Sequence, residues 1–194
     1  MNKIVLASNN KHKIKEFNEI YKDTIILSLE DIGFNEDIEE NGTTFLENAL
    51  IKAKTISSYL KEKGIECPVM AEDSGLEVDS LNGEPGIYSA RYASDHDAKK
   101  NRDYLISKLS GKENKNANFI CCLVKYMPDD TYIYAYGKTY GHIIEEELGN
   151  TSFGYDCIFY SHDLNKTFRE ATSEEKNSVS HRKRAILELQ KKEQ

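Results

Sequence analysis

The chain opens with an alternation of apolar, strand-like runs and amphipathic helical segments, and this alternation limits the folds open to it. A short apolar run at Ile4–Ala7 is followed by a polar turn at 8–13 and by apolar residues at helical spacing over 14–21. A second strand-like run lies at Ile25–Leu27, and a longer helical pattern begins near Thr44. This order of strand, turn and helix predicts an α/β fold.

The rest of the chain continues this pattern without an internal repeat or a proline-rich linker. The expected elements, in chain order, are the end of the long helix near Gly64, strands at 69–71 and 76–78 separated by the residues EDSG, a helix at 95–109, a hairpin of strands at 118–126 and 131–144, a short apolar segment at 157–160 and a C-terminal helix from Ser180. We therefore expect one domain over residues 1–194.

Charge and hydropathy exclude several classes of protein. The 33 acidic and 26 basic residues give a net charge of −7, which argues against a protein that binds nucleic acid through a basic face. The longest apolar run, Phe119–Val124, has six residues, far fewer than the roughly 20 that cross a bilayer. The apolar stretch at the N-terminus is too short for a secretory signal, so we expect a cytoplasmic protein without a membrane partner. The four cysteines show no CxxC spacing and are expected to be buried thiols.

The residues SNNKHK, at Ser8–Lys13, join the first strand to the first helix. Unpaired backbone N–H groups and the positive end of the helix dipole favour an anion at such a junction, and the polar side chains add further donors. The absence of glycine excludes a P-loop. The alternative interpretation is that Asn10 caps the helix and the lysines are solvated.

Carboxylates gather at a second place in the sequence. Glu72 and Asp73 lie at the expected end of a buried strand, and together with Glu40 they could supply oxygen ligands to Mg²⁺. Adjacent residues of a strand point to opposite faces, so one of the pair could be structural. Lys52 lies beside the apolar stripe of its helix and is expected to point toward the body of the protein, as a functional group or as a lysine that extends past the core.

Basic residues cluster near the C-terminus, at Lys176 and at 181–184. If a helix begins close to His181, these cations lie at the positive end of its dipole and need an anionic or electron-rich partner. If the helix instead begins at Thr172, with Glu175 completing a capping box, a solvated basic face is the better explanation. Both alternatives remain open at this point.

Five sequence blocks, in order along essentially the whole chain, resemble the inosine triphosphate pyrophosphatases. These enzymes, also called dITP/XTP pyrophosphatases, hydrolyse aberrant purine nucleoside triphosphates to the monophosphate and pyrophosphate. The blocks are SNNKHK at 8–13, EENGTTFLENALIKA at 39–53, AEDSGLEVDSLNGEPGIYSARYA at 71–93, FGYD at 153–156 and EEKNSVSHR at 174–182. The chain departs from the family in having Glu72 where many members have Asp, and Cys157 where Pro is usual.

The resemblance implies a role for each matching residue. Asp73 would accept a proton and contact Mg²⁺, Glu40 would be a second metal contact, and Ser74 would contact the substrate. The residues that would bind the triphosphate are Ser8, Asn9, Asn10, Lys11, His12, Lys13 and Lys52. The residues that would enclose the base and ribose are Phe153, Gly154, Tyr155, Asp156, Lys176, His181 and Arg182. The implied fold is an elongated mixed β-sheet flanked by helices, with two lobes around a central nucleotide cleft, in a homodimer.

Discrimination between purines is expected at the 6-oxo edge of the base. His181 and Arg182 are the candidate donors, because a 6-amino purine would leave them unpaired. Two other functions remain open: a related pyrophosphatase for modified pyrimidine triphosphates, and a nucleotide-binding regulator without chemistry. For a regulator, the carboxylate pair beside phosphate would be an electrostatic cost without a benefit.

Overall fold

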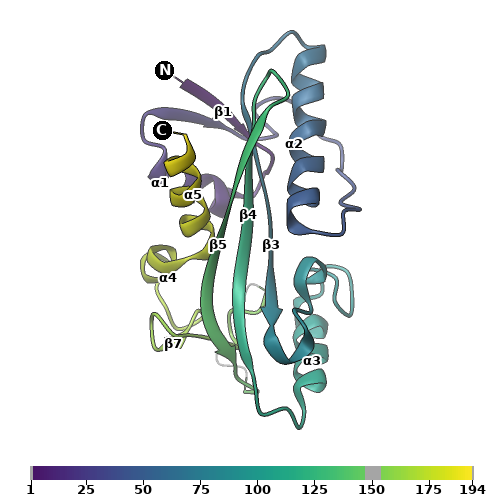
Figure 1. Ribbon diagram of the computed structural model, residues 1–194, viewed down its shortest axis with the longest axis vertical. Helices are drawn as coiled ribbons and strands as arrows, with labels where there is room; N and C mark the ends of the chain where they lie inside the picture. The colour runs from purple at the N-terminus through teal and green to yellow at the C-terminus, as the bar shows by residue number, and fades with distance from the viewer. Residues whose placement is uncertain (1, 147–153, 194) are drawn as a thin grey trace. The chain divides into compact units, whose positions relative to one another are not determined.

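The structure, a computed structural model, describes residues 2–146 and 154–193. Its strands form one seven-stranded sheet in the order β2-β1-β3-β4-β5-β6-β7 (Figure 1). The strands are β1 (Asn2–Leu6), β2 (Thr24–Leu27), β3 (Val69–Val78), β4 (Asn116–Tyr126), β5 (Tyr132–Ile143), β6 (Phe159–Ser161) and β7 (Lys166–Thr167). Strand β1 pairs in parallel with β2 and β3, whereas β6 pairs antiparallel with β5 and β7. This mixed sheet confirms the predicted α/β class.

Five α-helices accompany the sheet in the described part of the chain. They are α1 (Lys11–Ile20), α2 (Phe45–Glu62), α3 (Ala98–Leu109), α4 (Ser173–Val179) and α5 (His181–Lys192). Two short 3₁₀ turns lie at Asp79–Leu81 and Gly86–Tyr88. Among the described residues, no helix is both long enough and apolar enough to cross a membrane.

The chain divides into two compact units, each assembled from separate stretches. Unit 1 consists of Met1–Asp73, Cys122–Tyr136 and Ala185–Gln194, and unit 2 consists of Ser74–Cys121 and Gly137–Arg184. Strands β3, β4 and β5 each contribute residues to both units.

Helix α2 covers the apolar core of unit 1. Its small and branched residues Ala49, Ala53 and Ile56 are fully buried in one cluster with Val69 and Ala71 of β3. These positions follow the three-to-four-residue spacing that the sequence predicts. The helix begins where the capping pattern places it, because the side chain of its N-cap Thr44 accepts a hydrogen bond from a backbone N–H one turn ahead. Figure 1 shows α2 on one side of the strands of unit 1 and α1 on the other.

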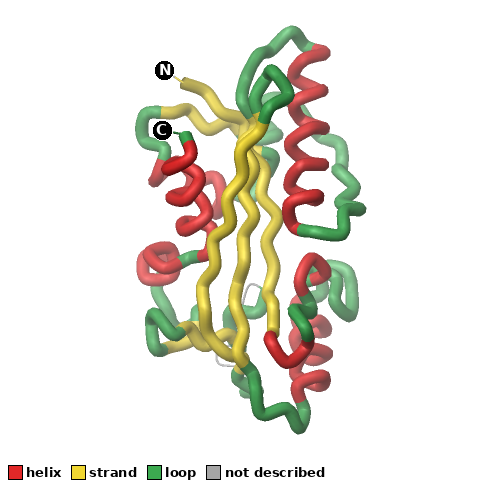
Figure 2. Tube along the Cα trace, viewed as in Figure 1, coloured by secondary structure: helices red, strands yellow, loops and turns green. Residues whose placement is uncertain are grey.

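Strand β3 corrects the sequence prediction at the position of the carboxylates. The residues EDSG were expected to separate two short strands, but the structure contains one strand of ten residues (Figure 2). The last of them, Gly75, and the next residue, Leu76, are buried within the sheet, and Leu76 donates its backbone N–H to Ser89 Oγ at 2.9 Å. The carboxylates therefore lie inside a strand and not at its end. Because Met70 is the partner of Leu6, the last residue of β1, they lie just past the end of β1.

The C-terminal region contains two helices in place of the single one expected. Thr172 caps α4 with the predicted capping box, and Ser180 then interrupts the helix with an extended backbone. The Ser180 hydroxyl accepts the Lys183 N–H at 3.0 Å and so caps α5. The two alternative helix starts, at Thr172 and near His181, are thus both used. Lys176 lies in the last turn of α4, where the helix dipole favours a cation. Residues 181–184 form the first turn of α5.

All four cysteines are buried, as expected. Burial raises the pKa of the Cys122 thiol to about 11. A thiol with such a pKa remains protonated at neutral pH, which agrees with a packing role.

Candidate functional site

The loop between β1 and α1 is held by its own polar side chains. Ser8 Oγ accepts the N–H of Asn10 at 3.1 Å, and Asn10 Oδ1 accepts the N–H of Lys13 at 3.3 Å. Asn9 Oδ1 accepts the N–H of Glu30 at 2.8 Å. The predicted Asn10 cap is thus present, and the loop has an ordered conformation at the N-terminus of α1. His12 lies in the first turn of α1, and its side chain is outside the described part of the structure.

The alternative interpretation also held that the lysines of this loop are solvated. For Lys13 this is wrong. Its ammonium lies 2.8 Å from Glu72 Oε1, and the Glu72 side chain is only 2% exposed. The pair explains how a buried carboxylate is tolerated in the middle of β3. Glu72 therefore faces α1, and Lys13 is held at the position where β1 ends.

Replacing Lys13 with Met is expected to destabilise the unliganded protein, because Glu72 would lose its ammonium partner in a buried position. We expect the free energy of unfolding to fall by about 2 kcal/mol, less than the roughly 3 to 5 kcal/mol of fully buried pairs, since Lys13 is partly exposed. Urea unfolding measures the change. Lys11→Met, at an exposed position of the same helix, is the control and should shift stability by less than about 0.5 kcal/mol. Equal stability of Lys13→Met and wild type would contradict a supporting role for the pair.

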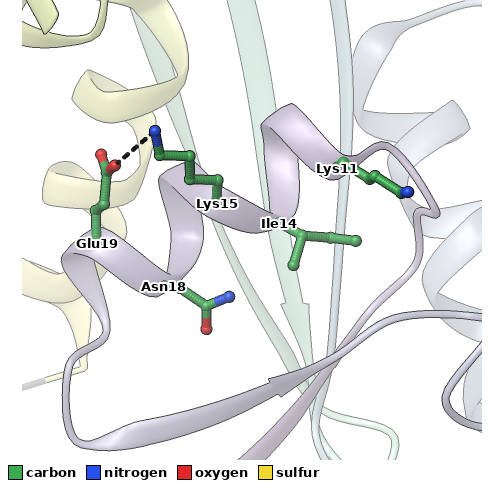
Figure 3. A pocket seen from close by; sticks show the side chains of 5 residues that line it. All are labelled: Lys11, Ile14, Lys15, Asn18 and Glu19. Atoms are coloured by element: carbon green, nitrogen blue, oxygen red, sulfur yellow. Dashed lines mark ion pairs between the residues drawn. The ribbon is translucent and has the colours of Figure 1, made fainter.

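A hollow lined by residues of α1 does not coincide with the predicted site. It is lined by Lys11, Ile14, Lys15, Asn18 and Glu19 (Figure 3). Lys15 is engaged with Glu19 at 3.8 Å. Of these residues only Lys11 belongs to the predicted phosphate loop, so the hollow on its own supports no assignment.

Asp73 faces the opposite side of β3, toward α2. Its Oδ2 accepts a hydrogen bond of 3.0 Å from the side-chain amide of Asn48. Asn48 also accepts the backbone N–H of Gly42 at 2.8 Å. Sequence reasoning missed Asn48 as a functional candidate. The available signal was a polar side chain beside Ala49, within the mostly apolar buried face of the helix.

One turn further along α2, Lys52 contacts the acidic segment before the helix. Its ammonium lies 2.6 Å from Glu40 Oε2, and its side chain is only 14% exposed. Lys52 therefore points toward the body of unit 1, as predicted, and it is brought together with a predicted metal contact. Two neighbouring turns of α2 thus contact the predicted carboxylates, Asn48 contacting Asp73 and Lys52 contacting Glu40.

The donor set on this side suits a hard cation. The described residues contain no group of three His, Cys, Asp or Glu side chains placed to hold a metal by themselves. Mg²⁺ does not require such a cage, since it usually takes one or two carboxylates together with substrate phosphate oxygens and water. Asp73 and Glu40 are two oxygen donors of this kind, each in contact with a residue of α2, so their chemistry fits the predicted ion.

In unit 2, Asp156 and Lys176 form the central ion pair of the second predicted cluster. Asp156 Oδ2 lies 2.5 Å from Lys176 Nζ. Burial raises the pKa of Asp156, and the positive charges of Lys176, Arg169 and Arg182 oppose this effect without cancelling it. Arg182 is thus close enough to act electrostatically on Asp156.

The pKa direction at Asp156 predicts a pH dependence of stability. Because the folded protein holds this proton more tightly than the unfolded chain, the carboxyl stabilises the fold most below about pH 4, and the contribution is lost as pH rises through the raised pKa. The difference in unfolding free energy between wild type and Asp156→Asn should therefore fall as pH rises. Urea unfolding at a series of pH values measures it, with Asp163→Asn as a half-exposed control. A difference that grows with pH would contradict the assignment.

The remaining residues of the FGYD block are fixed by backbone contacts. The Gly154 carbonyl accepts a hydrogen bond of 2.8 Å from Arg102, and the Tyr155 hydroxyl donates to the Ser89 carbonyl at 2.8 Å. Arg102 is a buried residue of α3 that sequence reasoning missed. Phe153, predicted to contact the base or ribose, lies outside the described residues.

His181 is buried at the start of α5 and stacks on Phe119 of β4. The two ring centroids lie 5.2 Å apart, with planes inclined by 19°. His181, in the first turn of α5, therefore has an electron-rich ring as its neighbour. An anionic or electron-rich partner was expected for the basic cluster if a helix began close to His181. Ser74, the remaining predicted contact, follows Asp73 on β3 and is half-buried in unit 2.

Comparison with known proteins identifies the family of this chain. The model of the Ham1 family matches residues 4–192. A dITP/XTP pyrophosphatase of Clostridium perfringens is 50% identical over 195 residues, which cover 97% of this chain and 96% of the relative. The solved structure of the Staphylococcus aureus Ham1 protein has a TM-score of 0.86 at 39% identity, over 97% of this chain and 96% of that one. A HAM1 protein from Coxiella burnetii also has a TM-score of 0.86, at 34% identity over 97% and 96% of the two chains. A match of this length and similarity shows that the chain belongs to the Ham1 family.

Proposed function

We propose that this protein hydrolyses aberrant purine nucleoside triphosphates, such as ITP, dITP and XTP, to the monophosphate and pyrophosphate. The similar C. perfringens protein bears the name dITP/XTP pyrophosphatase. The observation that carries the proposal is the position of Asp73. This carboxylate lies on β3 just past the end of β1, and it is adjacent to the Glu72 that holds Lys13 of the loop proposed to bind phosphate.

The residues of unit 1 would bind and orient the polyphosphate. The loop Ser8–Lys13 offers backbone N–H groups at the start of α1, with Asn9 and Asn10 in the ordered turn, His12 in the helix, and the ammonium groups of Lys11 and Lys13. Lys52 adds a further positive charge on the α2 side. Positioning and neutralisation of charge are the main sources of rate acceleration in phosphoryl transfer.

Asp73 would accept the proton of the attacking water. An ordinary Asp has a pKa near 4 and is a weak base at neutral pH, so Asp73 needs assistance. Asp73 and Glu40 are the residues that would hold Mg²⁺, with Glu40 shared between the ion and Lys52. When bound, Mg²⁺ supplies charge neutralisation on the triphosphate and makes water a stronger nucleophile.

The cluster of unit 2 would bind the base and ribose. His181 and Arg182 are proposed donors to the 6-oxo edge of the purine. Asp156, Lys176 and the backbone around Gly154 and Tyr155 would contact the ribose or base, with Ser74 as a further substrate contact. Phe153 is retained from the sequence blocks as a base contact.

We further propose a single cytoplasmic domain that acts as a homodimer without a nucleic-acid or membrane partner. The family model extends through residues of both units, which supports one domain. The net charge of −7 supports the absence of a nucleic-acid partner. Light scattering on the purified protein tests the dimer.

Release of pyrophosphate from ITP in the presence of Mg²⁺ tests the proposed activity. The matched reactions contain dUTP in place of ITP, or ITP without metal. We expect pyrophosphate and IMP from the reaction that contains ITP and Mg²⁺, and neither matched reaction should release pyrophosphate. Preference for dUTP would favour the pyrimidine-directed alternative, and binding of ITP without any product would favour a regulator.

A further inference from the structure

Asn48 connects two segments of unit 1 through the two ends of one side chain. Its Nδ2 donates to Asp73 Oδ2 at 3.0 Å, and its Oδ1 accepts the Gly42 N–H at 2.8 Å. The residue is 1% exposed, so it is shielded from solvent on the helix that carries Lys52. Its amide therefore links β3 to the acidic segment that carries Glu40.

The chemistry of the partners fixes the orientation of this amide. A backbone N–H can only donate, so the amide oxygen must face Gly42. The amide nitrogen then faces Asp73, whose carboxylate can accept. Asn48 is therefore the donor in the hydrogen bond to Asp73, because its partners allow only one orientation of the amide.

Gly42 provides independent support that this contact is built into the fold. A Cβ atom at this position would lie 2.7 Å from Asn48 Oδ1 and 2.7 Å from Glu47 Cβ. Only glycine lets the acidic segment approach the helix this closely. The same segment contacts α2 again one turn later, through the Glu40–Lys52 pair.

We propose that Asn48 is a positioning residue that sets the spacing between the carboxylate of Asp73 and the segment bearing Glu40. The proposal rests on the proposed function of these two carboxylates. Donation to Oδ2 fixes the rotation of the Asp73 side chain, and acceptance from Gly42 fixes the segment two residues from Glu40. Because Asn48 is buried, it acts through these groups and not through the substrate.

Two substitutions of Asn48 separate its donor and acceptor functions. Asn48→Ala removes both hydrogen bonds, whereas Asn48→Asp keeps the acceptor for Gly42 and places a second carboxylate against Asp73. We expect kcat for ITP to fall about 10- to 100-fold in both variants, with KM changed less than about threefold. If Asn48 merely anchors the segment, Asn48→Asp should instead recover near-normal turnover, and the proposal is then overturned.

Hydrogen–deuterium exchange provides a readout besides activity. The Gly42 amide should exchange faster in Asn48→Ala than in wild type and should stay protected in Asn48→Asp. Asn101→Ala is the matched control for loss of a buried asparagine, since Asn101 holds backbone groups of residues 90–94 and belongs to no proposed site. We expect its kcat to stay within about threefold of wild type once the protein is shown to be folded.

A variant at a different position covers the case in which substitution of Asn48 prevents folding. Gly42→Ala leaves Asn48 in place but pushes its new methyl group against Oδ1, so we expect kcat to fall about tenfold. Wild-type kcat in a folded variant of Asn48, or in Gly42→Ala, would overturn the proposal.

A parallel measurement on Asp73→Asn distinguishes failure of this inference from failure of the proposed function. Normal turnover in Asp73→Asn means that the assignment of Asp73 is wrong. An inactive Asp73→Asn together with active Asn48 variants means that only the positioning role is wrong. If Asn48 acts through Asp73, the double variant Asp73→Asn/Asn48→Ala should be no slower than Asp73→Asn alone.

Discussion

Asp73→Asn is expected to lower the turnover of ITP by about 10³-fold or more while leaving nucleotide affinity within a few-fold of wild type. The substitution removes the group proposed to accept the proton and to hold the ion. It keeps an oxygen that can accept the hydrogen bond from Asn48, so the fold should survive. The lysines and the loop at the end of β1 are untouched, so the polyphosphate should still bind.

Single-turnover assays and calorimetric titration with ITP measure the two effects separately. Asp130→Asn is the matched control, because Asp130 is an exposed aspartate of unit 1, in the turn between β4 and β5, that pairs with Lys61 of α2. That variant should retain wild-type turnover. Near-normal turnover of Asp73→Asn would rule out the assignment, whereas loss of both turnover and binding would indicate a damaged site.

His181→Phe is expected to weaken the discrimination between ITP and ATP. A site built on buried hydrogen bonds to a 6-oxo group can reject the 6-amino analogue by up to about 10⁴-fold. Phenylalanine can maintain the stacking on Phe119 but removes both ring nitrogens. We expect kcat/KM for ITP to fall about 10- to 100-fold, with little change for ATP, so that the ratio falls by the same factor.

The control for this experiment is another stacked histidine of unit 2. His142 stacks on Tyr160 with centroids 4.9 Å apart and belongs to no proposed site. His142→Phe should leave the ratio of kcat/KM for ITP to that for ATP unchanged. A wild-type protein that hydrolyses ITP and ATP equally well would already refute the role of the 6-oxo edge.

The sequence predicted the fold class because its local signals are strong. Strand-forming and helix-forming periods alternate cleanly, and Thr44 marks the start of α2 with a cap that the structure contains. The prediction failed at β3, where polar residues looked like a turn. Their tolerance in a strand depends on partners distant in sequence, Lys13 for Glu72 and Asn48 for Asp73, which local patterns do not reveal.

The predicted site illustrates the same limit at the level of side chains. The inward orientation of Lys52 could be anticipated from helical spacing, because Lys52 lies beside the buried stripe, but its pairing with Glu40 could not. The roles of Asn48 and Arg102 could not, because each contacts a group that is brought to it only by the folded chain. The two C-terminal helices were also hidden, since Thr172 and Ser180 are both good caps and only the packed structure uses both.

Because neighbouring side chains of β3 point to opposite faces, this strand should tolerate changes of chain length very unequally. Deleting one residue just before Glu72 would turn Asp73 toward α1 and Glu72 toward Asn48, so that the two carboxylates would exchange environments. Deleting two residues would restore the faces but withdraw both groups from the end of β1. The stretch from Met70 to Asp73 is therefore confined to a fixed number of residues, whereas a turn outside the proposed site, such as the one between β4 and β5, should tolerate insertions.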